Sequence, residues 1–333
     1  MTDTSPPPAT ETPFVRPDVR MFLGYLNSLP GPRTHEMTPA QARQLYLASK
    51  DLTDLPVGEL AVVRDLVIPG PAGTIRARLF DAAEHREPGP AVVFFHGGGF
   101  VIGDIDTHAG FCGEMARVLR LPVISVDYRL APEHKWPAAP DDAEAAARWV
   151  AESPAELGRS VTGLVLCGDS AGGNLAIVAA LDLRDRPAKV PVIVQAPIYP
   201  AADMGGDYPS FSAFAEGFLL TRASMLWFND AYGADLGHQR SSPVQADLAG
   251  MPPAVIVTAS LDPIRDQGRA YAAKLAQAGV PVVFREAVGN VHGFVTLRKA
   301  VPSSQGDVAG YLVALRAAIT EAEGNLVMAQ AAG

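Results

Sequence analysis

The sequence predicts an α/β protein whose core is a mostly parallel β-sheet with helices on both faces. Six short runs are almost entirely apolar, as expected for strands that are buried on both faces of such a sheet. These runs are residues 91–95, 123–126, 164–167, 190–194, 254–258 and 280–284. Helical patterns lie between most of them, at 108–120, 140–152, 171–185 and 263–278. Alternating strand and helix signals are typical of a doubly wound sheet. The chain has 333 residues, 48% of them hydrophobic, which is enough for a large core.

The residues before the first buried run add two helices and two strands to the predicted order. Two helical patterns lie within 14–57, and the second is introduced by Thr38 as N-cap with Pro39 at the first helical position. Residues 61–68 and 74–80 are expected to form two strands, because a turn rich in Pro and Gly separates them. The predicted sheet therefore has eight strands.

An apolar insertion interrupts the alternation after residue 200. Its large apolar side chains are Phe211, Phe214, Phe218, Leu219, Leu220, Met225, Leu226, Trp227 and Phe228. Such an insertion must pack on something, and with the N-terminal helices it is expected to form a lid over one edge of the sheet. A satellite core without a binding role is the alternative. The expected organisation is a mobile N-terminus at 1–13, a helical cap from 14–57 and 200–238, and a main α/β domain from 58–199 and 239–325 that ends in a helix at about 304–323.

Composition and charge exclude several classes of function. Lys and Arg number 27 against 36 Asp and Glu, and the formal net charge of -9 argues against nucleic-acid binding. Cys112 and Cys167 lie in apolar surroundings, so we expect both to be reduced and buried in a cytoplasmic protein. No signal-peptide or anchor pattern is visible at the N-terminus, and the most apolar long stretch, 163–183, contains charges and glycines. Membrane association is therefore not expected.

The strongest chemical signal is the sequence Gly-Asp-Ser-Ala-Gly-Gly at 168–173. It follows a predicted strand and precedes a predicted helix, which is the context in which a GxSxG motif forms a nucleophile elbow. Glycines on both sides allow a strained turn that lifts the Ser170 hydroxyl above the sheet, at the N-terminus of a helix. An ordinary tight turn is the alternative interpretation.

A glycine-rich loop supports the same chemistry. His96, three glycines and Phe100 come directly after the predicted strand at 91–95. Two backbone N–H groups of this loop, with that of Ala171 as a third, would be able to donate to an oxyanion. A phosphate cradle would need a Walker lysine or a dinucleotide spacing, and neither is present. A plain flexible loop remains the alternative.

A serine nucleophile needs a base and an orienting acid, which in this topology follow it in the order acid, then histidine. The stretch 259–263, which contains Asp262, comes directly after the predicted strand at 254–258, at the strand end where α/β sites gather. Of the seven histidines, only His292 lies beyond the last predicted strand. Asp266 is the rival acid, but it falls inside the following helix, where an exposed or capping carboxylate is the better interpretation.

With these motifs together, the sequence resembles the hormone-sensitive-lipase-like family of α/β-hydrolases, in its bacterial GDSAG branch. The resemblance covers roughly 60–325 and rests on HGGGF, GDSAGGN, the late Asp-Pro and His-Gly-Phe. The stretch DYRLAPEH at 127–134 is also typical of that family, and Arg129 with Glu133 is expected to form an ion-paired brace beside the elbow. The resemblance implies an α/β-hydrolase fold with a helical cap.

The resemblance also implies roles for single residues. It assigns the nucleophile to Ser170, the base to His292 and the orienting acid to Asp262. It places the oxyanion hole at Gly98, Gly99 and Ala171, with Gly97 as a further candidate. The predicted substrate-binding residues are Phe100, Asp169, Phe214 and Leu219.

These expectations describe a serine carboxylesterase that forms an acyl-enzyme. The cap, rich in Phe and Leu, favours short or medium acyl chains or aromatic esters of small molecules. The chemistry requires no metal or cofactor, and no Cys/His ligand cluster is visible in the sequence. Activity is expected to rise with pH through about 6–7, the range in which an ordinary histidine loses its proton.

Other outcomes stay open at this point. A non-catalytic small-molecule receptor on the same fold, resembling the gibberellin receptors, is the alternative from another class. Amidase, lactonase or deacetylase activity would use the same residues. The strand at 280–284 is expected at a sheet edge, where a homodimer would be able to form.

Overall fold

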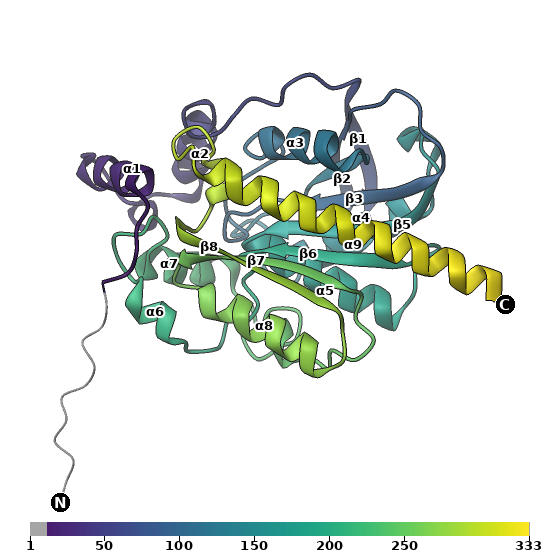
Figure 1. Ribbon diagram of the computed structural model, residues 1–333. Helices are drawn as coiled ribbons and strands as arrows, with labels where there is room; N and C mark the ends of the chain where they lie inside the picture. The colour runs from purple at the N-terminus through teal and green to yellow at the C-terminus, as the bar shows by residue number, and fades with distance from the viewer. Residues whose placement is uncertain (1–11, 333) are drawn as a thin grey trace, which may run out of the picture.

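The computed structural model describes residues 12–332, with side chains up to residue 328, and contains one eight-stranded sheet. The strands lie in the order β1-β2-β4-β3-β5-β6-β7-β8 (Figure 1). Their bounds are β1 Val62–Gly70, β2 Gly73–Asp81, β3 Gly89–Phe95, β4 Val123–Asp127, β5 Val161–Asp169, β6 Val192–Ile198, β7 Ala254–Leu261 and β8 Val282–Val291. β1 and β2 form an antiparallel hairpin, β2 is antiparallel to β4, and all other pairs are parallel. The predicted mostly parallel, eight-stranded sheet is confirmed.

Helices cover both faces of the sheet. α3 (Ala109–Leu119) and α9 (Ser304–Ala332) share one apolar core with the sheet, and Figure 1 shows α9 lying across that face. α4 (Ala138–Ala151), α5 (Ala171–Asp185) and α8 (Arg265–Gln277) close the opposite face over a second core. α9 runs past the predicted end at residue 323, because the residues that follow are mostly good helix formers.

Burial along the strands follows their place in the sheet. β3 and β5 lie in the middle, and nearly all of their residues are buried. β8 is the edge strand, as predicted, and its first half is exposed, with Val283 at 43% and Phe284 at 41%. The prediction that this last run is buried on both faces is therefore wrong, because its residues at the sheet edge lie open to solvent.

Four further helices gather at the end of the sheet toward which the strands run (Figure 1). They are α1 (Pro17–Ser28), α2 (Pro39–Thr53), α6 (Pro209–Ala213) and α7 (Arg222–Tyr232). α2 begins as predicted: the Thr38 hydroxyl accepts from the Gln41 amide, and the Gln41 side chain accepts from the Thr38 amide. Short 3₁₀ helices complete the chain at Thr34–Glu36, Ala155–Leu157, Pro243–Gln245 and Phe294–Thr296.

The N-terminal segment and the insertion pack on each other through a small apolar cluster. Val19 and Leu23 of α1 meet Phe214 and residues at the ends of β7 and β8. The exact division into cap and main domain stays a prediction, and residues 1–11 of the expected mobile N-terminus lie outside the described range. Within residues 12–332, no helix combines the length and the apolarity that crossing a membrane would demand.

Candidate active site

Ser170 occupies a sharp turn between the end of β5 and the start of α5. Its backbone has φ 55° and ψ −116°, a strained conformation for a residue other than glycine. The turn is held because the Ser170 amide donates to the Ile198 carbonyl at 2.9 Å and the Ser170 carbonyl accepts from Asn174 and Ala201. A Cβ at Gly172 would lie 1.9 Å from the Phe95 carbonyl oxygen. The motif forms the expected elbow, and its glycine is required by that close approach.

Three side chains that follow three different strands meet in one hydrogen-bonded row. Ser170 Oγ lies 2.8 Å from His292 Nε2, and His292 Nδ1 lies 2.7 Å from Asp262 Oδ2. Ser170, Asp262 and His292 come directly after β5, β7 and β8, whose carboxyl ends lie along the same edge of the sheet. The sequence prediction of these three residues and their order agrees with this geometry.

The environment of Asp262 determines the proton positions in this row. Asp262 is fully buried, and its second oxygen accepts the Ile264 amide at 2.9 Å. An ionised carboxylate can only accept hydrogen bonds, so His292 Nδ1 carries the proton. His292 Nε2 is then left with a lone pair that faces the Ser170 hydroxyl.

Asp266, the rival acid, has other partners. Its carboxylate pairs with Arg265 at 2.8 Å and Arg269 at 3.3 Å and accepts the Ser210 amide at 3.0 Å. Burial alone would raise the pKa of Asp266, but these arginines and the Ser210 amide lower it. The residue therefore ties α8 to the insertion and does not reach the imidazole.

The glycine loop after β3 lies beside the elbow. Gly98 and Gly99 have φ of 120° and 59°, and a Cβ on Gly98 would lie 2.1 Å from the Ile102 carbonyl oxygen. Within residues 12–332, the amides of Gly98, Gly99 and Ala171 donate to no protein acceptor. The Gly97 amide donates to Asp169 Oδ1 at 2.7 Å. Gly97 is therefore corrected from a candidate oxyanion donor to the anchor of the loop.

Two of the predicted substrate-binding residues are buried in the scaffold. Phe100 is 2% exposed and stacks on Tyr232 of α7 at 3.9 Å between ring centroids. Asp169 is 4% exposed, and its oxygens face the Gly97 amide, His108 and the Tyr199 hydroxyl. Because both side chains already contact other groups of the protein, we assign Phe100 and Asp169 to support of the glycine loop and not to substrate contact.

The other two predicted residues lie on the insertion. Phe214 is 5% exposed and packs on Phe218, with the Arg265 guanidinium 5.1 Å from its ring. Leu219 has φ 71°, and its Cδ2 lies 3.8 Å from the position that a Cβ on Gly293 would take. Leu219 is therefore next to the residue that follows His292, whereas Phe214 packs against α1.

Two neighbours of the site were missed in the sequence. The Phe228 ring of α7 lies 2.3 Å from the position of a Cβ on Gly99, so only glycine fits there. Tyr199 directly follows β6, and its ring centroid is 4.6 Å from that of His292. Tyr199 could have been found, because it comes directly after a parallel strand, where site residues gather. The sequence showed Phe228 only as one of the apolar residues of the insertion.

The predicted brace between Arg129 and Glu133 is wrong. Arg129 pairs with the buried Asp142 of α4 at 2.8 Å, and Glu133 pairs with Arg43 of α2 at 2.6 Å. The two residues therefore attach one loop to two different helices. Their proximity in sequence suggested a local pair, but each finds an opposite charge on a more distant segment.

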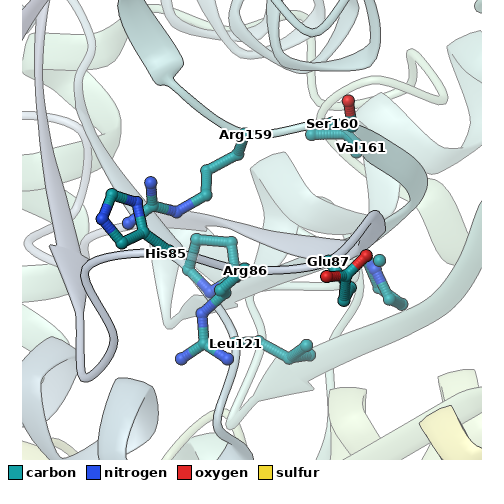
Figure 2. Close-up of a pocket in the computed structure, with 10 residues that line it drawn as sticks. His85, Arg86, Glu87, Leu121, Arg159, Ser160 and Val161 are labelled. Carbon is teal, nitrogen blue, oxygen red and sulfur yellow. The ribbon is translucent and has the colours of Figure 1, made fainter.

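A cavity of about 340 Å³ lies at the other end of the sheet, near the amino ends of β3 and β5. It is lined by His85, Arg86, Glu87, Gly89, Pro90, Leu121, Pro122, Arg159, Ser160 and Val161. Figure 2 shows the Arg86 guanidinium, the Glu87 carboxylate and the Ser160 hydroxyl pointing in different directions. Arg86 and Arg159 both bind the buried Asp81, so these two lining residues belong to a structural ion-pair cluster. Among residues 12–332, no group of His, Cys, Asp or Glu is arranged to hold a metal ion.

A serine elbow on a mostly parallel sheet, with a histidine and an acid from the last two strands, defines an α/β hydrolase. A model of the "alpha/beta hydrolase fold" family matches residues 92–296. The chain is 40% identical to esterase LipI of Mycobacterium tuberculosis, covering 80% of this chain and 85% of LipI. It is 36% identical to carboxylesterase NlhH of the same organism, covering 93% and 99%. The hyperthermophilic esterase of Pyrobaculum calidifontis superimposes with a TM-score of 0.85 at 36% identity, covering 92% and 99%. The chain belongs to the hormone-sensitive-lipase-like α/β-hydrolases.

Proposed function

We propose that the protein is a serine carboxylesterase that hydrolyses short- to medium-chain esters of small molecules through an acyl-enzyme. The observation that supports this most directly is the continuous row from the Ser170 hydroxyl through His292 to the buried Asp262. The similar proteins named esterase and carboxylesterase support the same class of reaction.

The proposed reaction begins with attack by Ser170 Oγ on the acyl carbon while His292 Nε2 takes its proton. Asp262 keeps the proton on Nδ1 and stabilises the imidazolium that forms. His292 then protonates the leaving alcohol, and an acyl-enzyme remains on Ser170. Water attacks this ester with His292 again as base, which releases the acid and restores the serine.

The tetrahedral intermediates need donors for their negative oxygen. The proposed donors are the amides of Gly98, Gly99 and Ala171, which lack protein acceptors within residues 12–332. Ala171 is also the first residue of α5, so the positive end of a helix dipole adds to its effect. Each such donor lowers the barrier by about 3–4 kcal/mol.

The preference for short or medium chains rests on the side chains that lie against the site. Phe228 packs on Gly99 of the glycine loop, and Leu219 packs beside Gly293. Large apolar groups at both places reduce the room for a long acyl chain and offer an apolar surface to a short one.

A series of p-nitrophenyl esters from acetate to palmitate tests the proposal. We expect the highest kcat/KM with short to medium acyl groups and a steep fall for palmitate. The Ser170→Ala variant is expected to lose activity by at least about 10³-fold on every ester. Turnover of amides or lactones in preference to all the esters, or ligand binding without turnover, would replace this proposal.

A further inference from the structure

A buried pair of side chains beneath the glycine loop has no place in the mechanism described so far. His108 is completely buried, Asp169 is 4% exposed, and His108 Nε2 lies 3.2 Å from Asp169 Oδ1. The same Oδ1 accepts the Gly97 amide at 2.7 Å. One carboxylate oxygen therefore joins the histidine to the loop that presents the proposed oxyanion donors.

The contacts around His108 favour one protonation state of the ring. Thr107 Oγ1 lies 2.8 Å from the Asp104 carbonyl oxygen and 3.0 Å from His108 Nδ1. When the hydroxyl donates to that carbonyl, its oxygen accepts from a protonated Nδ1. A bare Nε2 would turn a lone pair toward the carboxylate oxygen and be repelled by it. This arrangement favours protons on both nitrogens, which is the imidazolium form. Because Nε2 is not aligned for a hydrogen bond, its attraction to Asp169 is mainly one of charge.

The other titratable groups around His108 agree with that charge. Burial alone would lower the pKa of His108, but Asp169, Asp104 and Asp54 raise it above its ordinary value. The charge on Asp54 is shared with Arg298, which binds it at 2.7 Å.

Two further titratable rings face His108 and add no charge. The His96 ring centroid is 5.7 Å away, and burial together with the charge on His108 lowers the pKa of His96 to about 4, so that ring is neutral. The Tyr46 ring, 6.1 Å away, has its pKa raised by burial and by Asp169 and is neutral as well. Of the two histidines, His108 is therefore the one whose surroundings favour the charged form.

Without its partner, the Asp169 charge would act against the reaction. Asp169 immediately precedes Ser170, and it holds the residue next to Gly98. A lone carboxylate in this dry environment would repel the negative oxygen that forms on the substrate. Its charge also acts on His292, since the two attract each other.

We propose that His108 is a positioning residue: it neutralises Asp169, so that the carboxylate anchors the glycine loop without opposing the oxyanion. The inference rests on the proposed esterase function. His108 touches neither the substrate nor the relay, and acts through Asp169 and the loop.

Three variants separate charge balance from simple packing. In His108→Gln a side-chain amide replaces the ring N–H but carries no charge, so Asp169 is uncompensated. In Asp169→Asn an amide oxygen can still accept the Gly97 amide without a negative charge. The double variant is neutral throughout. The matched control is Asp81→Asn, which breaks a buried ion pair at the opposite end of the sheet.

We expect His108→Gln to lower kcat on p-nitrophenyl acetate by about 10–100-fold with little change in KM, since the loss falls on transition-state stabilisation. The acid limb of its pH–rate profile moves to higher pH, because an uncompensated Asp169 favours the protonated form of His292. The double variant is expected to recover at least about tenfold of kcat and the original acid limb. Asp169→Asn alone stays within about tenfold of wild type. The Asp81→Asn control leaves the pH profile unchanged.

A double variant as slow as His108→Gln, or slower, would overturn the inference. If each substitution only removed packing and hydrogen bonds, the two losses of kcat would add up, whereas removal of two opposite charges restores the charge balance. If His108→Gln does not fold, Asp169→Asn alone decides: a loss above about 100-fold contradicts the proposed role. An inactive wild-type enzyme would instead refute the proposed function itself, so the two failures are distinguishable.

Discussion

The two nitrogens of the His292 ring are held in opposite roles by their neighbours. Asp262 accepts from Nδ1 and is itself fixed by the Ile264 amide, which leaves Nε2 facing the serine. The proposed activation of the Ser170 hydroxyl depends on this fixed tautomer. Ser170 contributes the strained backbone that places its hydroxyl in front of Nε2.

The fixed tautomer is tested by Asp262→Asn. The Asn oxygen would still accept the Ile264 amide, so its NH₂ group would face Nδ1 and force the proton onto Nε2. We expect kcat at about pH 7 to fall by about 10⁴-fold with a small change in KM. The control, Asp266→Asn, removes a carboxylate of the same helix region that pairs with arginines, and it is expected to keep kcat. Similar losses in both variants would mean that Asp262 acts through stability alone.

At the scale of elements, the strand ends explain why the site was visible in the sequence. In the structure Ser170, Asp262 and His292 each follow a strand directly, and in the sequence each comes shortly after a predicted apolar run, which is a local pattern. Contacts between distant segments were not visible, because no local pattern records them. Phe228 against Gly99 and Arg129 on Asp142 are contacts of this kind. From the sequence alone the Gly97 amide was a candidate oxyanion donor, because its hydrogen bond to Asp169 forms only in the folded chain.

Asp81, the last residue of β2, allows a test of stability at the end of the sheet opposite to the candidate active site. Asp81 is fully buried and binds Arg86 and Arg159 at 2.6 and 2.9 Å. These two arginines line the cavity of Figure 2. Burial alone would raise the pKa of Asp81, but hydrogen bonds from Arg86, the Ala83 amide and Arg159 lower it. We expect Asp81→Asn to lower the free energy of unfolding by about 3–5 kcal/mol near pH 7, measured with urea.

The pH dependence of that loss follows from the direction of the shift. A carboxyl whose pKa is lowered by folding stabilises the protein above its unfolded pKa, about 3.9, and this contribution disappears as pH falls through the lower folded pKa. The difference between wild type and Asp81→Asn should therefore shrink below about pH 4. A difference that stays constant down to about pH 2 would show that the charge of Asp81 is not responsible. Asp185→Asn, in the exposed pair with Arg184, should lose less than about 1 kcal/mol.

At the scale of the whole molecule, the sheet has two edges with different exposed side chains. β8 ends the sheet on one side, with Val283, Phe284 and Val288 exposed, and β1 ends it on the other, with Val63 and Val67 exposed. An edge strand presents unpaired backbone groups to a second chain. We propose that two copies of the protein pair through β8.

Light scattering after size exclusion tests this pairing. We expect a measured molar mass of two chains for the wild type and of one chain for Phe284→Lys, because a lysine on an edge strand prevents pairing. Val63→Lys, on the opposite edge, is the control and should remain dimeric. A wild-type protein that is monomeric at all concentrations would refute the proposal.

In the proposed mechanism one serine, Ser170, is the nucleophile and His292 activates it. Incubation with a fluorophosphonate, followed by peptide mass spectrometry, tests this directly, because the reagent traps an activated serine covalently. We expect a single adduct on Ser170 that forms at least about 10³-fold more slowly in His292→Ala. No adduct, an adduct on another serine, or an unchanged rate in His292→Ala would contradict the account.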